Sequence, residues 1–223
     1  GTYTIENDEV VTLNKGSRGN DIVLTIDIKL QQEIEKILEE EIIKTKKEPS
    51  TSLFNHAYVV IKEPNTGEIL AMSGKQVVKS NGEYDIYDIT PGVLTNPITP
   101  GSVVKGASML VGYNEGAISI GEYQKDECIK LYSKPRKCSW SKLGIIDDIT
   151  ALSLSSNVYQ FKTAMKVAGF NYFYNGKFNN TNDAFNKYRK TFNEFGLGVK
   201  TGIDLPVDGI GNVGTKTDAD LLL

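Results

Sequence analysis

The stretch Pro100-Gly101-Ser102-Val103-Val104-Lys105 constrains what this chain can fold into more than any other part of it. Proline followed by glycine is typical of a turn, and the apolar spacing that follows predicts a helix from Ser102 to about residues 114–116. Residues three positions apart share one face of a helix, so Ser102 and Lys105 are expected to lie one turn apart. The chain therefore presents a hydroxyl and an amine together where a turn becomes a helix.

This pair of residue types suggests nucleophilic catalysis. A serine hydroxyl is a poor nucleophile unless a neighbouring base removes its proton, and a lysine amine can be that base when burial or a nearby cation lowers its pKa. Backbone N–H groups and the dipole at a helix N-terminus favour a developing oxyanion. Ser102 is therefore a candidate nucleophile and Lys105 its candidate base, although S-x-x-K alone also fits a surface serine and lysine on an ordinary helix.

A second polar motif, Ser155-Ser156-Asn157, lies further along the chain between two segments with helical spacing. Ser155 could pass a proton between the lysine and a leaving amine. Asn157 could hold the lysine side chain and a substrate amide. The tripeptide alone equally fits a capping serine with a solvent-facing asparagine, but the two motifs together predict one cleft.

The composition suits a globular protein. The chain has 223 residues, of which 39% are hydrophobic and 24% charged, which is enough apolar material for a core. The formal net charge is −3 and the basic residues are spread along the chain, so we expect no nucleic-acid partner. No apolar run approaches the ~18 residues of a membrane span and no secretory signal is visible, so any anchor is expected outside this chain.

Hydrophobic periodicity and turn residues predict most elements. Residues 1–20 are interpreted as a linker or the end of an upstream domain. Asp27 is expected to cap a helix whose apolar stripe contains Leu30, Ile34, Ile37, Leu38 and Ile42. The remaining expectations are a short strand at 22–26, a helix at 28–47, a hairpin at 57–61 and 68–72, an irregular segment at 73–99, helices at 148–154, 158–167 and 182–195, and an irregular segment from 196 onward.

The two motifs together resemble the S-x-x-K and S-x-N motifs of penicillin-binding proteins and β-lactamases. Residues 24–31 resemble the start of the transpeptidase domain of class B penicillin-binding proteins, and residues 65–72 resemble its first hairpin. Residues 195–206 are similar to the segment that follows the S-x-N helices. Residues 101–107 resemble in particular the cell-elongation branch of Gram-positive bacteria.

The resemblance implies an α/β fold of the α+β type. This is the penicillin-binding-protein/β-lactamase-like transpeptidase fold, a central antiparallel sheet flanked by helices. Residues 21–223 would be the N-terminal two-thirds of the domain, with the C-terminal strands missing from this chain. The third family motif, K-T-G, is not in its expected place: Lys200-Thr201-Gly202 spells it within what is a loop in the family, so Lys200 is interpreted as a decoy, and Lys216-Thr217 lacks the glycine.

The resemblance also implies an activity. It is that of a serine D,D-transpeptidase that cross-links peptidoglycan stem peptides through an acyl-enzyme on Ser102 and is inhibited by β-lactams. The implied place is the extracytoplasmic face of the cell membrane, with a glycosyltransferase and other cell-wall synthesis proteins as partners and with links to cell shape and antibiotic resistance. A β-lactamase or β-lactam sensor, and a non-catalytic fragment or scaffold without the third motif, remain alternatives.

No cofactor is required for the implied chemistry, but the two cysteines leave three alternatives open. Cys128 and Cys138 fit two free or partly buried thiols. They fit a disulfide because the family works outside the cytoplasm. They also fit a structural zinc site, since thiolates bind zinc and some class B penicillin-binding proteins carry it, but two further ligands would be needed. His56, the only histidine, is interpreted as a strand-end residue.

Overall fold

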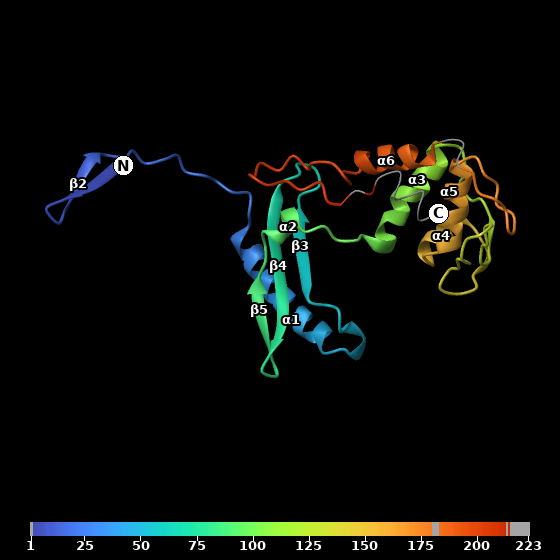
Figure 1. The fold of residues 1–223 in the computed structure, drawn as a ribbon, viewed down its shortest axis with the longest axis horizontal. Helices are drawn as coiled ribbons and strands as arrows, with labels where there is room; N and C mark the ends of the chain where they lie inside the picture. The colour runs from blue at the N-terminus through green and yellow to red at the C-terminus, as the bar shows by residue number, and fades with distance from the viewer. Residues whose placement is uncertain (1, 180–182, 213, 215–223) are drawn as a thin grey trace. The chain divides into compact units, whose positions relative to one another are not determined.

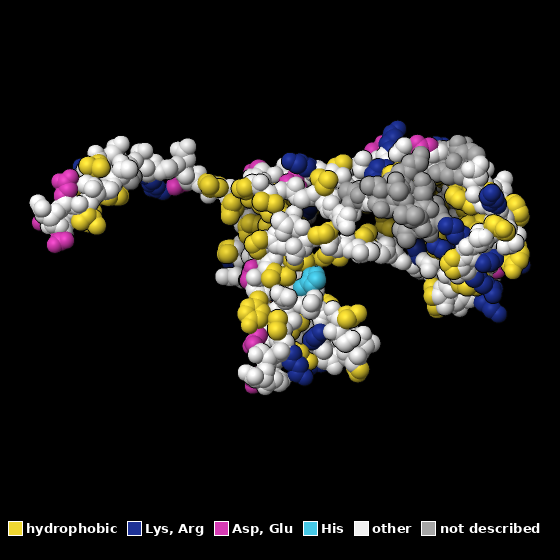
Figure 2. All heavy atoms as spheres, viewed as in Figure 1, with side chains coloured by type: hydrophobic (Ala, Val, Ile, Leu, Met, Phe, Trp, Pro, Cys, Tyr) yellow, Lys and Arg dark blue, Asp and Glu magenta, His cyan; other side chains and the backbone are white. Residues whose placement is uncertain are grey.

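The computed structural model describes residues 2–179, 183–212 and 214. The chain forms two compact units, residues 1–93 and residues 94–223 (Figure 1). Within the described residues, no helix is long and apolar enough to cross a membrane. Lys and Arg side chains are dispersed over the face of the described residues in Figure 2 without a continuous basic surface, as expected from the spread of basic residues along the sequence.

The first unit consists mainly of one long helix against a three-stranded antiparallel sheet. The sheet has the order β3-β4-β5, with bounds His56–Lys62, Ile69–Ser80 and Glu83–Asp88, and the helix is α1, Ile28–Lys46. The Asp27 carboxylate accepts hydrogen bonds from the first backbone N–H groups of α1, which confirms the predicted cap. Ile34, Leu38 and Ile42 are buried, but Ile37 is 49% exposed, so the predicted stripe is one residue too wide.

The predicted hairpin is confirmed, but the irregular segment at 73–99 is wrong. Strand β4 continues to Ser80 and returns as β5 through Asn81-Gly82, whose φ angles of 51° and 91° suit a tight hairpin turn. The sequence hid this strand because a charged residue, Lys75, lies in its buried part. The Lys75 ammonium forms ion pairs at 3.2 Å with both Glu39 and Asp88, which compensates for its burial.

Two expectations near the N-terminus also differ from the structure. Residues 22–26 form no strand and remain largely exposed. In place of a ladder of strand hydrogen bonds, the Thr25 hydroxyl donates one hydrogen bond to the Ile69 carbonyl of β4, at 2.6 Å. Residues 2–14 form a hairpin that was not predicted, with β1 at Thr2–Glu6 and β2 at Glu9–Asn14.

The second unit carries the candidate site on short helices. Its larger elements are η2 (Gly101–Val104), α3 (Lys105–Asn114), α4 (Asp148–Ser153), α5 (Asn157–Val167) and α6 (Ala184–Glu194). The loop between α3 and α4 contains a short antiparallel pair, β6 (Gln124–Asp126) and β7 (Gly144–Ile146), which was not predicted. The brief elements η1 (Pro49–Thr51) in the first unit and α2 (Gly92–Thr95) complete the chain.

A small apolar core fixes α3, α4 and α5 against one another. Its buried members are Met109 on α3, Ile118, Ile146, Ala151 on α4 and Tyr159 on α5. Each of the three helices contributes at least one side chain that is almost fully buried, so the helices that carry the two motifs share one packed centre.

A buried carboxylate reinforces this centre. Asp148, which is 1% exposed, accepts hydrogen bonds from the Tyr113 hydroxyl and from the backbone N–H groups of Gly121 and Ile149. Burial opposes ionisation of Asp148, but these hydrogen bonds outweigh it and lower the pKa of the carboxyl. Tyr113 lies on α3, so the carboxylate links α3 to the start of α4.

Replacing Asp148 by alanine is expected to lower the free energy of unfolding by about 2–4 kcal/mol, because three hydrogen bonds to a buried carboxylate are lost. The extra stability of the wild type is fully present above a pH of about 3.9, the pKa of the Asp148 carboxyl in the unfolded chain. It is lost as the pH falls through the lower pKa of this carboxyl in the folded protein. Urea unfolding at neutral and stepwise lower pH measures both effects. Asp147→Asn is the matched control, because asparagine caps a helix as well as aspartate; a loss no larger than the control's would contradict the role of Asp148.

Candidate active site

Ser102 and Lys105 lie one helical turn apart, as predicted. Ser102 belongs to η2, and the backbone N–H of Lys105 donates to the Ser102 carbonyl. The predicted helix start is three residues early, because the α-helix proper begins at Lys105 and Ser102 occupies the 3-10 turn before it. Gly101 has a φ of 60°, a conformation that favours glycine, and it lets the chain turn sharply into η2. Ser102 is exposed and Lys105 is partly buried.

The Lys105 ammonium brings the two motifs together. Its Nζ donates to the Ser155 carbonyl at 2.7 Å, to the Ser155 hydroxyl at 3.0 Å and to Asn157 Oδ1 at 2.7 Å. Three N–H donors thus meet three acceptors that lie 50 or 52 residues away in the sequence. Within the described residues, the hydrogen bonds of Lys105 go to this motif and not to the Ser102 hydroxyl.

The environment of Lys105 makes its charged form less favourable than in water. Burial lowers the pKa of its amine, because the charged form loses hydration. The three acceptors on Ser155 and Asn157 are uncharged, so no carboxylate in this network offsets that loss. A lysine that loses its proton readily is suited to remove a proton from a serine.

Ser155 occupies a backbone position that usually belongs to glycine. Its N–H donates to the Leu152 carbonyl at 3.0 Å, and the Ser156 N–H donates to the Ala151 carbonyl at 2.8 Å. These two bonds form a Schellman motif that ends α4 and requires a left-handed residue, and Ser155 has a φ of 53°. A side chain in that conformation is disfavoured, which is common at functional sites.

Ser156 and Asn157 begin the next helix directly. The Ser156 hydroxyl accepts a hydrogen bond from the Tyr159 N–H at 2.9 Å, and Ser156 is fully buried. Ser156 is therefore a structural cap, and Asn157, the first residue of α5, contacts Lys105 through its side chain. Each residue of the tripeptide has one defined position: Ser155 is the left-handed residue that terminates α4, Ser156 caps α5 and Asn157 begins α5.

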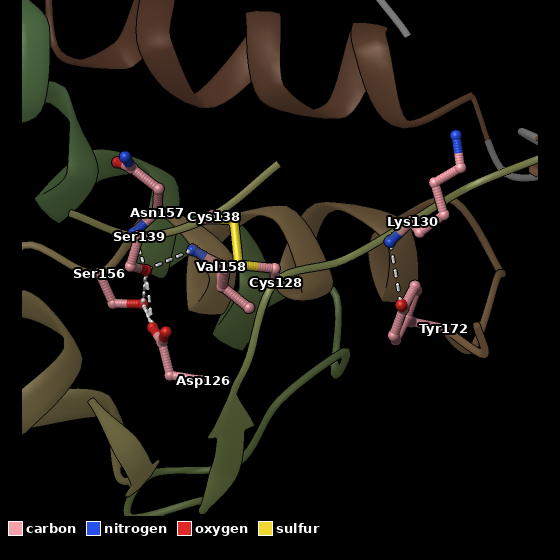
Figure 3. The surroundings of a disulfide bond; sticks show 9 residues. All are labelled: Asp126, Cys128, Lys130, Cys138, Ser139, Ser156, Asn157, Val158 and Tyr172. Carbon is pink, nitrogen blue, oxygen red and sulfur yellow. Dashed lines mark hydrogen bonds between the residues drawn. A yellow bond between two sulfur atoms is a disulfide. The ribbon is translucent and has the colours of Figure 1, made fainter. Parts of the chain in front are cut away.

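Two residues that contact this motif were not predicted from the sequence. The Ser139 hydroxyl accepts hydrogen bonds from the backbone N–H groups of Asn157 and Val158, both at 3.1 Å. Asp126, which is 5% exposed, accepts hydrogen bonds from both Ser139 and Ser156 (Figure 3). No local pattern marks either residue, since Asp126 ends the short strand β6 and Ser139 lies in the loop that follows, both away from the motif in sequence.

The structure joins Cys128 and Cys138 in a disulfide, which is one of the three alternatives (Figure 3). The zinc interpretation is corrected by this bond, because zinc binds thiolates and these sulfur atoms are bonded to each other. Among the described residues, no group of three or more metal-binding side chains supplies the further ligands.

The segment that spells K-T-G lies in irregular structure. Lys200 is exposed, and Thr201 and Gly202 donate hydrogen bonds to Asp208 at 3.1 and 3.0 Å. No strand includes these three residues, in agreement with the interpretation of Lys200 as a decoy. Lys216-Thr217 and the end of the chain, on which the expectation of missing C-terminal strands partly rests, lie outside the described residues.

Comparison with known proteins gives one consistent family. A family profile described as "Penicillin binding protein transpeptidase domain" matches residues 57–220, well over half of the chain. Penicillin-binding protein 2A of Bacillus subtilis is 43% identical over 213 residues, and penicillin-binding protein 2B of Streptococcus pneumoniae is 34% identical over 215 residues. These alignments cover 95% and 92% of this chain but 30% and 31% of the two relatives, so the chain spans less than a third of their length.

Solved structures show the same fold. Penicillin-binding protein 2B from Streptococcus pneumoniae strain R6 matches with a TM-score of 0.81 and 33% identity, over 93% of this chain and 34% of that chain. The TP domain of Burkholderia pseudomallei penicillin-binding protein 3 matches with a TM-score of 0.62 over 89% of this chain and 50% of that chain, and at 18% identity the likeness concerns the fold alone. The expected α+β transpeptidase fold is confirmed, and every named strand pair of the described residues is antiparallel.

The left-handed backbone of Ser155 predicts an unusual stability order. Ser155→Gly is expected to be more stable than Ser155→Ala by roughly 1 kcal/mol, because both lose the hydroxyl but only glycine fits a positive φ without strain. Urea unfolding of the two variants measures the difference. In the control pair at Ser153, the last residue of α4, alanine should be the more stable variant, because glycine is less favourable than alanine at a helical position. The same order at both positions would contradict the backbone argument.

Proposed function

The chain belongs to the penicillin-binding protein transpeptidase family, and we propose that it carries the nucleophile and the base of a serine D,D-transpeptidase. The observation that supports this most strongly is the hydrogen-bond network of Lys105. A partly buried amine is held by Ser155 and Asn157 one helical turn from the exposed hydroxyl of Ser102. The proposal concerns the whole protein, because this chain spans less than a third of the length of its relatives.

The first step is acylation of Ser102. A neutral lysine amine has two N–H donors and one lone pair. The Ser155 carbonyl and Asn157 Oδ1 can only accept hydrogen bonds, so they take both donors, and the lone pair is left for a hydroxyl. In the structure the Ser155 hydroxyl lies in this third direction, and in the proposed step the Ser102 hydroxyl approaches the same lone pair. Lys105 then takes the Ser102 proton as the oxygen attacks the peptide carbonyl next to the terminal D-alanine. The developing oxyanion is stabilised by backbone N–H donors.

The leaving group receives a proton through Ser155. Its hydroxyl lies 3.0 Å from the Lys105 Nζ and can both accept and donate a proton. The proton taken from Ser102 therefore passes from Lys105 through Ser155 to the departing D-alanine nitrogen, and the carbon–nitrogen bond breaks. The amine of a neighbouring stem peptide then attacks the acyl-enzyme, which forms the cross-link and returns the proton to Ser102 through the same residues.

The wider setting follows from the same proposal. The substrates are peptidoglycan stem peptides, and β-lactams acylate Ser102 as their mimics. The protein acts on the extracytoplasmic face of the cell membrane, beside a glycosyltransferase and other cell-wall synthesis proteins. The relatives are named as penicillin-binding proteins, which supports the penicillin-binding part of the proposal. The proposed chemistry uses groups of the protein itself and calls for no cofactor.

A fluorescent penicillin is expected to label the intact protein at Ser102. Ser102→Ala should abolish the label, and Lys105→Ala should slow acylation by at least the ~10²-fold typical of removing a general base. Gel fluorescence with peptide mapping measures both, with Ser108→Ala, one turn after Lys105, as the serine control. Label that survives in Ser102→Ala would contradict the nucleophile, and rapid loss of the label from wild type would indicate a β-lactamase.

Lys200→Ala is expected to leave the acylation rate nearly unchanged, because Lys200 lies in exposed irregular structure. Stopped-flow measurement of the acylation rate constant tests this. A loss of tenfold or more, about 1.4 kcal/mol of barrier, would identify Lys200 as part of the third family motif and overturn its interpretation as a decoy.

A further inference from the structure

The start of helix α5 is held by two serines that lie far apart in sequence. The first three backbone N–H groups of a helix have no partner within the helix. In α5, the Ser139 hydroxyl accepts from the first two, Asn157 and Val158, and the Ser156 hydroxyl accepts from the third, Tyr159. Asn157 contacts Lys105, so Ser139 fixes the backbone of a residue in the candidate active site from outside its motif.

Asp126 sets the direction of both hydroxyls. A serine hydroxyl has one donor and two acceptor positions. Ser139 and Ser156 both donate to the same carboxylate oxygen of Asp126, so their lone pairs are left to face the helix N–H groups. Figure 3 shows both serine side chains pointing toward Asp126. Because Asp126 is only 5% exposed, its buried carboxylate requires hydrogen-bond donors, and the two serine hydroxyls supply them.

The disulfide ties these residues together. Cys128 comes two residues after Asp126, and Cys138 comes directly before Ser139. The loop between the cysteines is closed further by paired backbone hydrogen bonds between Ile129 and Lys137, at 2.8 and 3.0 Å. A cross-link over so short a loop restricts how far the acceptor Asp126 and the donor Ser139 can separate.

Trp140, the residue after Ser139, forms a hydrogen bond with the backbone on the N-terminal side of the Ser155-Ser156-Asn157 motif. The indole N–H of Trp140 donates to the Leu154 carbonyl at 2.8 Å. Leu154 precedes Ser155, and the residues held by Ser139 follow it. The strained left-handed residue Ser155 is therefore flanked on both sides by contacts, from Trp140 before it and from Ser139 after it. We call residues 138–140 the clamp segment.

We propose that Ser139 is a positioning residue for acylation of Ser102, and that the Cys128–Cys138 disulfide keeps the clamp segment on the start of α5. Without this hold, Ser155 and Asn157 drift from Lys105, and the amine loses the two acceptors that direct its lone pair. The inference rests on the proposed transpeptidase function for its effect on rate. Its geometric part, the coupling of Ser139 to Lys105, stands apart from that function.

The experiment uses the intact protein and two readouts. The first is the rate constant for acylation by a fluorescent penicillin, recorded separately from the fraction of molecules that become labelled. The second is the pH profile of Lys105 acetylation by acetic anhydride, counted by mass spectrometry. The variants are Ser139→Ala, the hydroxyl-retaining Ser139→Thr and, as the matched control, Ser141→Ala, which changes an exposed serine two residues on.

The disulfide is tested in the wild type with dithiothreitol. Two thiols of one dithiothreitol molecule give two electrons and two protons to the Cys128–Cys138 bond, which becomes two thiols, while the reagent closes to its cyclic disulfide. Cys138 is exposed, so the bond is accessible to this reagent. Ser139→Ala keeps the disulfide and separates the role of the hydroxyl from that of the cross-link.

Ser139→Ala and the reduced protein are expected to lose at least about tenfold in acylation rate constant, because small displacements of reacting groups cost rates of this order. Lys105 acetylation in both should shift to higher pH, since a less enclosed amine is better hydrated. The acylation rate constants of Ser139→Thr and Ser141→Ala should remain within about twofold of the wild-type value.

Two results would overturn the inference. One is a wild-type rate constant in Ser139→Ala with fewer labelled molecules, which is the behaviour of a purely structural residue. The other is an unchanged Lys105 acetylation profile in Ser139→Ala. If penicillin fails to label even the wild type, the proposed function has failed, and the acetylation profile alone decides: a shift supports the coupling of Ser139 to Lys105 and no shift overturns it.

Discussion

The hydrogen bonds from the Lys105 ammonium to Ser155 and Asn157 are the interaction on which the second unit depends. They connect the start of α3 with the junction of α4 and α5, so the helix that follows Ser102, the proposed nucleophile, is joined directly to Ser155, the proposed relay. Burial of the amine without a charged partner costs stability, and the same burial lowers its pKa and prepares it to act as a base. The stability lost in this way is offset by helix capping, apolar packing and a nearby disulfide, and not by the lysine itself.

Three consecutive residues, Ser155-Ser156-Asn157, end one helix, start the next and supply the contacts to Lys105. Ser155 closes α4 in a left-handed conformation, Ser156 caps α5, and Asn157 begins it. Two helices thus meet without a linker, and the side chains on either side of the buried cap are directed to Lys105. A glycine in place of Ser155 would suit the backbone better but would remove the hydroxyl, so the strain is consistent with a chemical role for that side chain.

The parts of the site that depend on local spacing were predictable, and those that depend on distant contacts were not. The turn at Gly101 and the spacing of Ser102 and Lys105 follow from short-range rules, and so does the Asp27 cap of α1. Strand β4 beyond residue 72 was missed because Lys75 is buried with distant carboxylates, which hides the apolar pattern. Ser139 was missed for a similar reason, since a hydroxyl that caps a helix 18 residues later leaves no periodic signal.

The central claim is that the protein holds Lys105 ready to lose its proton. A titration of the Lys105 side chain by NMR, through its ¹³Cε resonance assigned by loss in Lys105→Met, tests it most directly. The account predicts a midpoint below that of free lysine in solution, because burial disfavours the charged amine. A midpoint equal to or above that of free lysine would contradict the account, because Lys105 would then stay charged and could not act as the base for Ser102.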